Sequence, residues 1–351
     1  MKRDLEEILS RLAALDLVRS FEKKRILITG ARGFLGQAFV RVFSELGNEV
    51  IALDRYTLAS ELGASPPEQL RGVEHVDWDV IESEPPTYGP IHYVLSLAAI
   101  ASPVHYARRP LDCFDVIVNG TRNMAELSAR KGATMLLSST SELYGDPIVV
   151  PSPENTIGRL DPWSVRGKAY DVPKLAAEAL VAIFREMAVK IQTVRYFNVY
   201  GNGLAEGDYR IMSKFASAVV RQVPLKVYGY GSQTRSFCYL TDAIVGTLLV
   251  LARGDGVPYN VGNPEEVSVH ALAEIFAKIG NLTIEKHEAP KEYVEEPRRR
   301  CPDIARIASL GFTPSVPLRE GVERLVTWAK EAYQQNPAPV SGYIHTSRQS
   351  R

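Results

Sequence analysis

Short apolar runs alternate with segments of helical periodicity over about the first two hundred residues. The runs carry apolar residues at consecutive positions, so both faces of each predicted strand are buried; they are "RILITG", "EVIALD", "HYVLSLAA", "ATMLLSS" and "KIQTVRYF". Helical stretches follow them, among them "FLGQAFVRVFSELG", residues 111–131 and residues 171–187. This alternation is typical of a parallel sheet with helices on both faces. The pattern therefore predicts an α/β fold built on a doubly wound parallel sheet.

Both ends of the chain depart from this pattern. Near the start, leucines and one isoleucine recur at helical spacing, which predicts a helix over residues 4–18 that packs on the main body or on a second subunit. Beyond residue 200, short strands such as "PLKVYG" and "PYNVG" mix with helices, which predicts a smaller α/β lobe. The predicted organisation is an N-terminal helical extension (1–24), a cofactor-binding domain (25–200), a substrate-binding lobe with some chain crossing back (201–334) and a flexible tail (335–351).

Composition and charge exclude several classes of protein. The 351 residues carry 41 basic and 41 acidic side chains, so no electrostatic feature indicates a nucleic-acid or membrane partner. The three cysteines are scattered and odd in number, which predicts a reducing cytoplasm, no disulfide framework and no metal site. No apolar run approaches the length of a membrane span, and acidic residues within the first apolar pattern argue against a signal peptide.

A glycine-rich turn, "GARGFLG", joins the first strand to the first helix of the sheet. Its glycines, at positions 30, 33 and 36, allow a tight turn, close approach to a pyrophosphate and close packing of helix on strand. Asp54 ends the next strand, where a carboxylate accepts hydrogen bonds from the adenosine ribose and repels a 2′-phosphate. This turn predicts a Rossmann-like domain that binds NAD. Arg32 and Arg55, beside these residues, leave the NADP alternative open.

A tyrosine and a lysine four residues apart, Tyr170 and Lys174, share one face of a predicted helix. The ammonium is expected to lower the pKa of the phenol, which then takes a proton from a sugar hydroxyl. Pro173 predicts that the helix begins just before it. Ligands of a doubly wound sheet lie beyond the carboxyl ends of its strands, so Thr140 and Glu142 are expected beside this pair.

The motifs carry a resemblance to a known family. The spacing G-x-x-G-x-x-G resembles the extended short-chain dehydrogenases/reductases (the NAD-dependent epimerase/dehydratase family), which act on nucleotide sugars. Residues 25–325 resemble its UDP-glucuronate decarboxylases in the stretches "SPVHYARRP", "LLSSTSELYGDP", "YDVPK", "RYFNVYG", "PLKVYGYGSQTRSFCYLTD", "VGNPEE" and "CPDIARIASLGFTPSVPLREGV". The resemblance implies a nucleotide-sugar substrate, NAD as cofactor and a homodimer formed through two helices of each subunit.

The motifs and the resemblance together assign the site residues. The predicted catalytic residues are Thr140, Glu142, Tyr170 and Lys174. The predicted cofactor-binding residues are Gly30, Gly33, Phe34, Leu35, Gly36, Asp54, Asp79, Val80, Leu97, Ala98, Ala99, Asn119, Tyr170 and Lys174. The predicted substrate-binding residues are Tyr106, Ser141, Asn198, Arg210, Tyr228, Gln233, Arg235 and Arg300. For Tyr228 a core position is an equal alternative, and for the run 298–300 the alternative is a solvated turn.

The resemblance implies a reaction in which C4 of UDP-glucuronate is oxidised, CO2 leaves the 4-keto acid and re-reduction gives UDP-xylose, unless the 4-keto pentose is released. Ser141 stands where the related 4,6-dehydratases carry an aspartate, and the 4-epimerases usually lack a glutamate at position 142. The alternatives are a 4-epimerase or 4,6-dehydratase on the same scaffold, or a non-catalytic NAD-binding protein.

Four departures from the decarboxylase pattern bear on the substrate. "SVRGKAYDVPK" is one residue longer than the pattern "GPRxCYDEGK", "YGNGL" replaces "YGPRM", and "GARG" replaces "GGAG". The first 24 residues have no counterpart in the pattern. The exact sugar and nucleotide therefore stay open.

Overall fold

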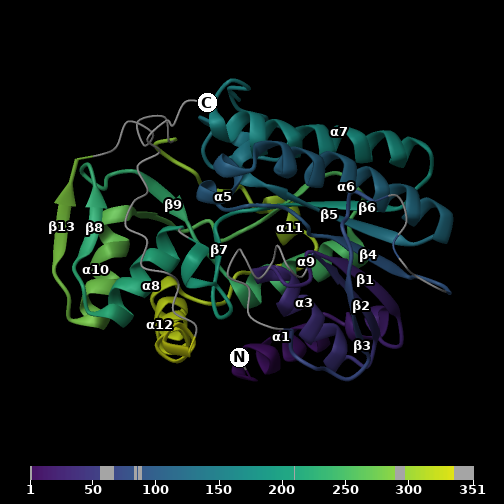
Figure 1. Cartoon of the computed structure of the whole chain (residues 1–351), viewed down its shortest axis with the longest axis horizontal. Coiled ribbons are helices and arrows are strands. Elements are labelled where there is room, and N and C mark those ends of the chain that lie inside the picture. Colours follow the sequence, from purple (N-terminus) through teal and green to yellow (C-terminus); the bar gives the residue numbers. More distant parts are fainter. Residues whose placement is uncertain are drawn as a thin grey trace, which may run out of the picture.

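The computed structural model describes residues 2–55, 67–82, 85, 89–208, 210–288 and 297–335. Its centre is a sheet of seven parallel strands in the spatial order β11-β6-β5-β4-β1-β2-β3 (Figure 1). In that order the strands are β11 (Tyr259–Val261), β6 (Ile191–Tyr196), β5 (Thr134–Thr140), β4 (Tyr93–Ser96), β1 (Arg25–Thr29), β2 (Glu49–Asp54) and β3 (Val73–Asp77). The winding reverses between β1 and β4, and at such a switch point the connections diverge and leave a crevice.

The five strands expected from apolar runs are confirmed, and the sheet contains two more. β3 lies at the edge of the sheet and none of its residues is fully buried, so its sequence "VEHVD" carries no continuous apolar run. β11 comes from the predicted lobe but pairs with β6, with Tyr259 opposite Val194. A strand from beyond residue 200 thus belongs to the main sheet, and the predicted domain boundaries stay predictions.

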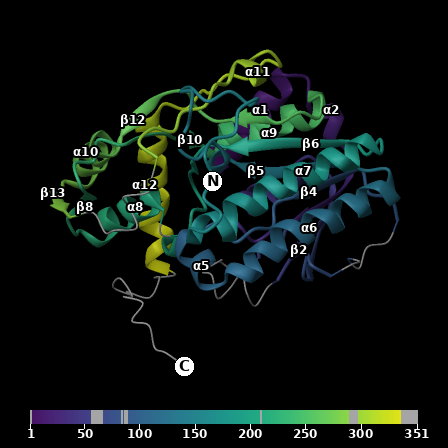
Figure 2. The same cartoon turned by 90° about the horizontal axis from the view of Figure 1, so that it is seen from above.

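Helices cover both faces of the sheet (Figure 2). One face carries α6 (Pro110–Lys131) and α7 (Val172–Glu186). The other carries α1 (Lys2–Ala14), α3 (Phe34–Glu45) and α9 (Leu240–Arg253). α9 is buried from its first residue to Leu251, because α1 and α3 pack against it. Of the two positions expected for the N-terminal helix, the structure shows the one on the main body, where Ile8 and Leu12 are buried.

The remaining elements form the lobe and its connections. The lobe packs α8 (Ile211–Arg221), α10 (Val269–Gly280) and α12 (Leu318–Gln335) around a separate apolar core. Its strand pairs are β8 (Leu225–Tyr228) with β13 (Ile284–His287), and β9 (Thr234–Ser236) with β12 (Glu266–Ser268). Short connecting elements are α2 (Val18–Phe21), α5 (Pro103–Arg108), β7 (Val199–Tyr200), β10 (Cys238–Tyr239) and α11 (Ala305–Ala308). The predicted flexible tail lies outside the described residues beyond position 335.

A π-helical turn, Gly167–Asp171, runs directly into α7. α7 itself begins at Val172, just before Pro173 as expected, but the backbone is already helical from residue 165. A π-turn holds one residue more than an α-turn, and "SVRGKAYDVPK" is one residue longer than the decarboxylase pattern. Gly167 is required at this turn, since a Cβ there would lie 1.7 Å from the backbone oxygen of Asp161. The extra residue is therefore absorbed in the π-turn that carries Tyr170.

Candidate active site

One cavity of about 1290 Å³ lies between the sheet and the lobe. Its walls come from the glycine turn, the ends of β2, β4 and β5, the start of α7 and the strands of the lobe. All but one of the predicted catalytic, cofactor-binding and substrate-binding residues line this cavity. Residues from both ends of the chain therefore converge at the sheet edge that the strand order predicts.

The exception is Asn119. It is exposed on α6, and its side-chain amide donates a hydrogen bond of 3.2 Å to Asp115. Val116 is the residue of this helix segment that reaches the cavity. Three further residues carry the helix about 4.5 Å away from the edge of the sheet. The prediction that Asn119 lines the cofactor site is wrong.

The glycine turn has the shape that a pyrophosphate requires. Gly30 adopts a φ of +66°, and a Cβ on Gly36 would lie 2.0 Å from the backbone oxygen of Gly30. Gly33 caps α3, whose first N–H groups have no partner within the helix. These N–H groups and the helix dipole attract phosphate oxygens. The turn therefore fits the diphosphate of the expected dinucleotide.

The carboxylate of Asp54 lies at the end of β2, on the cavity wall. The backbone N–H of Arg32 donates to it at 2.8 Å, and the side chain of Arg55 pairs instead with Asp79 at 3.0 Å. This arrangement fits an unphosphorylated adenosine ribose, because an acid faces the hydroxyl position and Arg55 is already paired. Burial raises the pKa of Asp54 to about 6, opposed by the hydrogen bond and charge of Arg32.

The raised pKa of Asp54 predicts a pH-dependent affinity for NAD. Ribose hydroxyls donate hydrogen bonds to the ionised carboxylate and stabilise it. Binding of NAD therefore lowers the pKa of Asp54 below its value of about 6 in the free protein. The affinity of the NAD-stripped protein is therefore expected to fall about tenfold between pH 7 and pH 5. Calorimetric titration with NAD at each pH measures it. Asp54→Asn, which has no titrating carboxyl at this position, is expected to give a flat profile, and an equal fall in that variant would contradict the assignment.

Tyr170 and Thr140 meet at the floor of the cavity. The Thr140 hydroxyl partly offsets the rise in the pKa of Tyr170, and the Tyr170 ring stacks on Tyr106 with centroids 5.7 Å apart. The Lys174 ammonium donates to the backbone oxygen of Ser138 at 2.6 Å and lies 5.8 Å from the centroid of the Tyr170 ring. The predicted hydroxyl pair at the strand end is thus present.

The expected lowering of the phenol pKa is wrong in this structure. Burial raises the pKa of Tyr170 above its ordinary value, and the nearby Cys113 and Glu142 raise it further. Burial also lowers the pKa of Lys174 to about 8, because the charged ammonium is no longer hydrated by water. Lys174 is directed at the backbone oxygen of Ser138 within β5, so in this structure it anchors the helix to the strand.

Glu142 and Arg300 form a two-point ion pair at the other side of Thr140. The guanidinium nitrogens of Arg300 donate to the two carboxylate oxygens at 2.6 and 2.8 Å, and Arg300 is almost fully buried. Of the run 298–300, Arg299 turns outward and pairs with Glu266. Arg166 approaches Glu142 at 3.5 Å and bonds Asp171 at 3.0 Å, and burial beside Glu142 raises the pKa of Asp171 to about 6.

Three of the predicted nucleotide-sugar residues lie in the lobe or between β6 and β7. Arg235 is buried and donates to the backbone oxygen of Pro297 at 2.9 Å, so its guanidinium has a fixed position. Arg210 forms a two-point pair with Asp208 at 2.5 and 2.9 Å. Asn198 donates to the backbone oxygen of Ser236 at 3.0 Å. Several cationic groups therefore face the cavity from the lobe, as an anionic ligand requires.

A buried network behind the site was not expected from the sequence. Arg195 donates to both oxygens of Glu178 at 2.9 and 2.7 Å, and to the Tyr144 hydroxyl at 3.0 Å. Ser139 donates to Glu178 at 2.5 Å, and Tyr144 donates to Asn260 at 2.6 Å. The network joins the end of β5 to α7, β6 and β11. Its one sequence signal is the position of Glu178, one helical turn after Lys174.

Two kinds of feature are absent from the part of the chain that the structure describes. Among those residues, no group of three or more histidine, cysteine, aspartate or glutamate side chains is arranged to hold a metal ion. Within the same residues, no helix is both long enough and apolar enough to cross a bilayer.

The chain is similar to known proteins in sequence and in fold. Residues 26–262 match the NAD dependent epimerase/dehydratase family. UDP-glucuronic acid decarboxylase 3 of Arabidopsis thaliana is 36% identical over 303 residues, which cover 85% of this chain and 86% of that protein. The epimerase Mth375 of Methanothermobacter thermautotrophicus shares the fold with a TM-score of 0.79, at 23% identity over 92% of this chain and 96% of that one.

A further solved structure carries ligands. MoeE5 in complex with UDP-glucuronic acid and NAD aligns with a TM-score of 0.72 and 25% identity, over 88% of this chain and 99% of that one. The glycine turn and the carboxylate of Asp54 fit NAD, and the family model and the decarboxylase relative cover most of the chain. The chain belongs to the NAD-dependent epimerase/dehydratase family, the extended short-chain dehydrogenases/reductases, and its cofactor is NAD.

Proposed function

We propose that the protein decarboxylates UDP-glucuronate to UDP-xylose or its 4-keto precursor. The observation that carries this proposal is the pairing of Glu142 with Arg300 in the cavity that Tyr170 and Thr140 also line. Ser141, also on the cavity wall, lacks the acid with which a dehydratase expels water. The identity of 36% to a UDP-glucuronic acid decarboxylase supports the same reaction.

The first step removes the proton of the sugar's C4 hydroxyl. The Tyr170 oxygen takes the proton of the C4 hydroxyl, while Thr140 hydrogen-bonds the same oxygen. NAD, held at the glycine turn and Asp54, would supply the acceptor and later the donor of the C4 hydride. Burial raises the pKa of Tyr170, so its phenol carries its own proton in the ligand-free protein; the reaction requires the phenolate, which the positive charges of Lys174 and of bound NAD+ would favour.

The ketone at C4 lies β to the C5 carboxylate, so the C5–carboxylate bond breaks and its electron pair moves onto the C4 oxygen. Tyr170 and Thr140 hydrogen-bond that oxyanion. Glu142 delivers a proton from solvent to C5, while Arg300 holds Glu142 at the sugar. The overall change consumes one proton and releases one CO2, with no net oxidation once C4 is reduced.

Release of labelled CO2 tests the function. UDP-glucuronate labelled in its carboxyl carbon is incubated with the NAD-loaded protein, and the expected result is labelled CO2 together with a UDP-pentose. A retained label with inversion at C4 would assign epimerase activity instead. No conversion by a protein that keeps its NAD would indicate a binding protein.

We infer that the protein forms a homodimer through α6 and α7. These helices lie side by side on one outer face (Figure 2). Apolar side chains stand exposed at both ends of this pair; they are Leu111, Phe114, Ile183 and Met187. The proposed compartment is the cytoplasm, because Cys113, Cys238 and Cys301 are all unpaired and buried.

Leu111→Glu is expected to weaken the dimer, since Leu111 is 74% exposed in the single chain and a charge there opposes burial against a second copy. Sedimentation velocity at micromolar concentration should show a dimer for the unaltered protein and a monomer for the variant. Val257→Glu, at an exposed apolar residue away from these helices, is the matched control and should stay dimeric. A monomeric unaltered protein would refute the inference.

A further inference from the structure

Asp4 of the N-terminal helix is a buried carboxylate that contacts three separate segments. It is 5% exposed. It accepts hydrogen bonds from the Asn202 amide at 2.7 Å, the Tyr239 hydroxyl at 3.1 Å and the Arg324 guanidinium at 3.1 Å. Asn202 follows β7, Tyr239 belongs to β10, and Arg324 lies on α12 of the lobe. A single side chain of α1 therefore links the lobe to the loop after β7.

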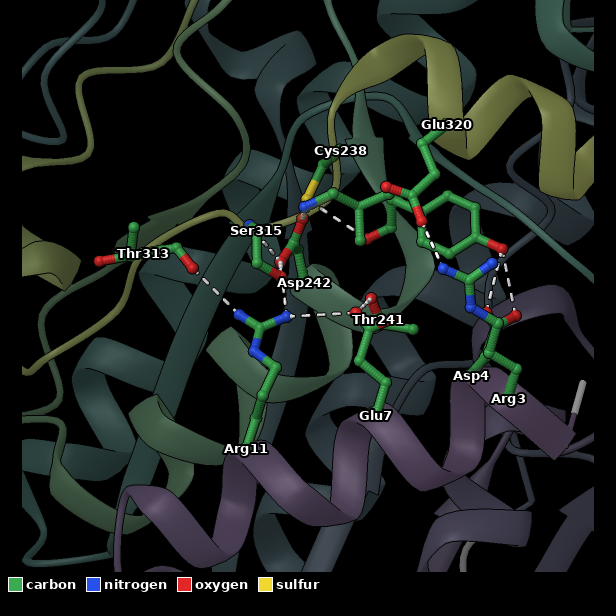
Figure 3. A network of polar contacts seen from close by, with 12 residues as sticks. Arg3, Asp4, Glu7, Arg11, Cys238, Thr241, Asp242, Thr313, Ser315 and Glu320 are labelled. Carbon is green, nitrogen blue, oxygen red and sulfur yellow. Dashed lines mark hydrogen bonds and ion pairs between the residues drawn. The ribbon is translucent and has the colours of Figure 1, made fainter.

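Further polar contacts dock the rest of α1 on the same surface (Figure 3). Glu7 accepts from Arg324 at 2.7 Å and from the Thr241 hydroxyl at 2.8 Å. One turn later, Arg11 donates to the buried Asp242 at 2.6 Å and to the backbone oxygen of Thr313 at 3.0 Å. Glu7 and Arg11 thus contact α9, α12 and the segment around Thr313 that precedes α12. Of these three residues of α1, Asp4 is the one that contacts Asn202.

The loop that begins at Asn202 forms part of the cavity wall. Gly203, Leu204 and Ala205 line the cavity, while Asn202 is turned to Asp4 and does not line it. The backbone oxygen of Leu204 accepts from the hydroxyl of Tyr333 on α12 at 2.8 Å. The loop is thus held at two points, at Asn202 by α1 and at Leu204 by α12.

The partners in this contact both depart from the decarboxylase pattern. Asn202 stands in "YGNGL" where the pattern "YGPRM" has a proline, and the first 24 residues have no counterpart. A proline side chain has no donor for a carboxylate. We propose that α1, through the Asp4–Asn202 hydrogen bond, positions the 202–205 loop and so sets the affinity of the site for the nucleotide sugar. Asp4 and Asn202 are positioning residues, and their role rests on the proposed substrate.

The test separates substrate affinity from stability. Asp4→Ala and Asn202→Ala are each expected to raise the KM for UDP-glucuronate about tenfold, the worth of one buried hydrogen bond to a charged group, with kcat changed less than about twofold. The double variant should raise KM no more than Asp4→Ala alone, because Asp4→Ala already removes the contact that Asn202→Ala removes. Asp4→Asn retains an oxygen that accepts from Asn202 and is expected to restore most of the affinity.

Arg11→Ala is the matched control, since it removes a buried contact of the same helix that does not reach the loop. It is expected to lower the melting temperature and to leave KM unchanged. An unchanged KM in Asn202→Ala, or an equal rise in Arg11→Ala, would overturn the proposal.

Calorimetric titration with UDP-glucuronate and with UDP keeps this test independent of turnover. If the unaltered protein binds UDP-glucuronate without releasing CO2, the decarboxylase assignment fails, and the affinity ratios of the variants still decide the role of Asp4. If the unaltered protein binds neither compound, both proposals fall.

Discussion

Tyr170→Phe is expected to lower the rate of CO2 release by about a thousandfold, because it removes the group that takes and returns the C4 hydroxyl proton. The change retains the ring that stacks on Tyr106 and adds no atom to the cavity. NAD should therefore stay bound, and its absorbance after denaturation of the purified variant measures how much remains.

Tyr93→Phe serves as the control for loss of a phenol. The Tyr93 hydroxyl donates to the backbone oxygen of Ser20 at 3.2 Å, and the residue does not line the cavity. Its turnover should lie within about twofold of the unaltered protein. More than a tenth of the normal rate in Tyr170→Phe would refute Tyr170 as the acid and base of the reaction.

Glu178→Ala is expected to cost about 3–5 kcal/mol in the free energy of unfolding, since it leaves the buried guanidinium of Arg195 without its anion. Ser139 also loses its acceptor, so the end of β5 and Thr140 should shift and turnover should fall. Urea denaturation, followed by circular dichroism at a fixed NAD concentration, measures the loss of stability.

Two comparisons make this test specific. Replacing both partners, as Glu178→Leu with Arg195→Leu, is expected to recover part of the lost stability, because no buried charge is then left alone. Glu323→Ala removes an exposed pair with Arg319 and should change the free energy of unfolding by less than about 0.5 kcal/mol. If Glu178→Ala lowers the free energy of unfolding by less than about 1 kcal/mol, the prediction is contradicted, because water has then replaced the carboxylate as the partner of Arg195.

Much of the candidate site follows from local patterns in the sequence. The glycine turn needs small residues at fixed spacing, and the apolar strand before it and the helix after it are visible in the sequence. Thr140 and Tyr170 could be placed at one crevice because parallel strands of a doubly wound sheet all end at the same edge. The misplacement of Asn119 shows the limit, since the pattern gives the helix but not the depth at which each turn meets the cavity.

The sequence by itself determined the sheet, the turn that fits NAD and the spacing of the tyrosine and lysine. Short-range sterics and periodic burial encode these features, and both act over a few neighbouring residues. Only the tertiary structure decided which charges meet: Glu142 with Arg300, Glu178 with Arg195, and Asp4 with Asn202. These partners are far apart in the chain, and a charged residue carries no local mark of its partner. The raised pKa of Tyr170 has the same origin, because burial comes from elements that pack around it only in the folded protein.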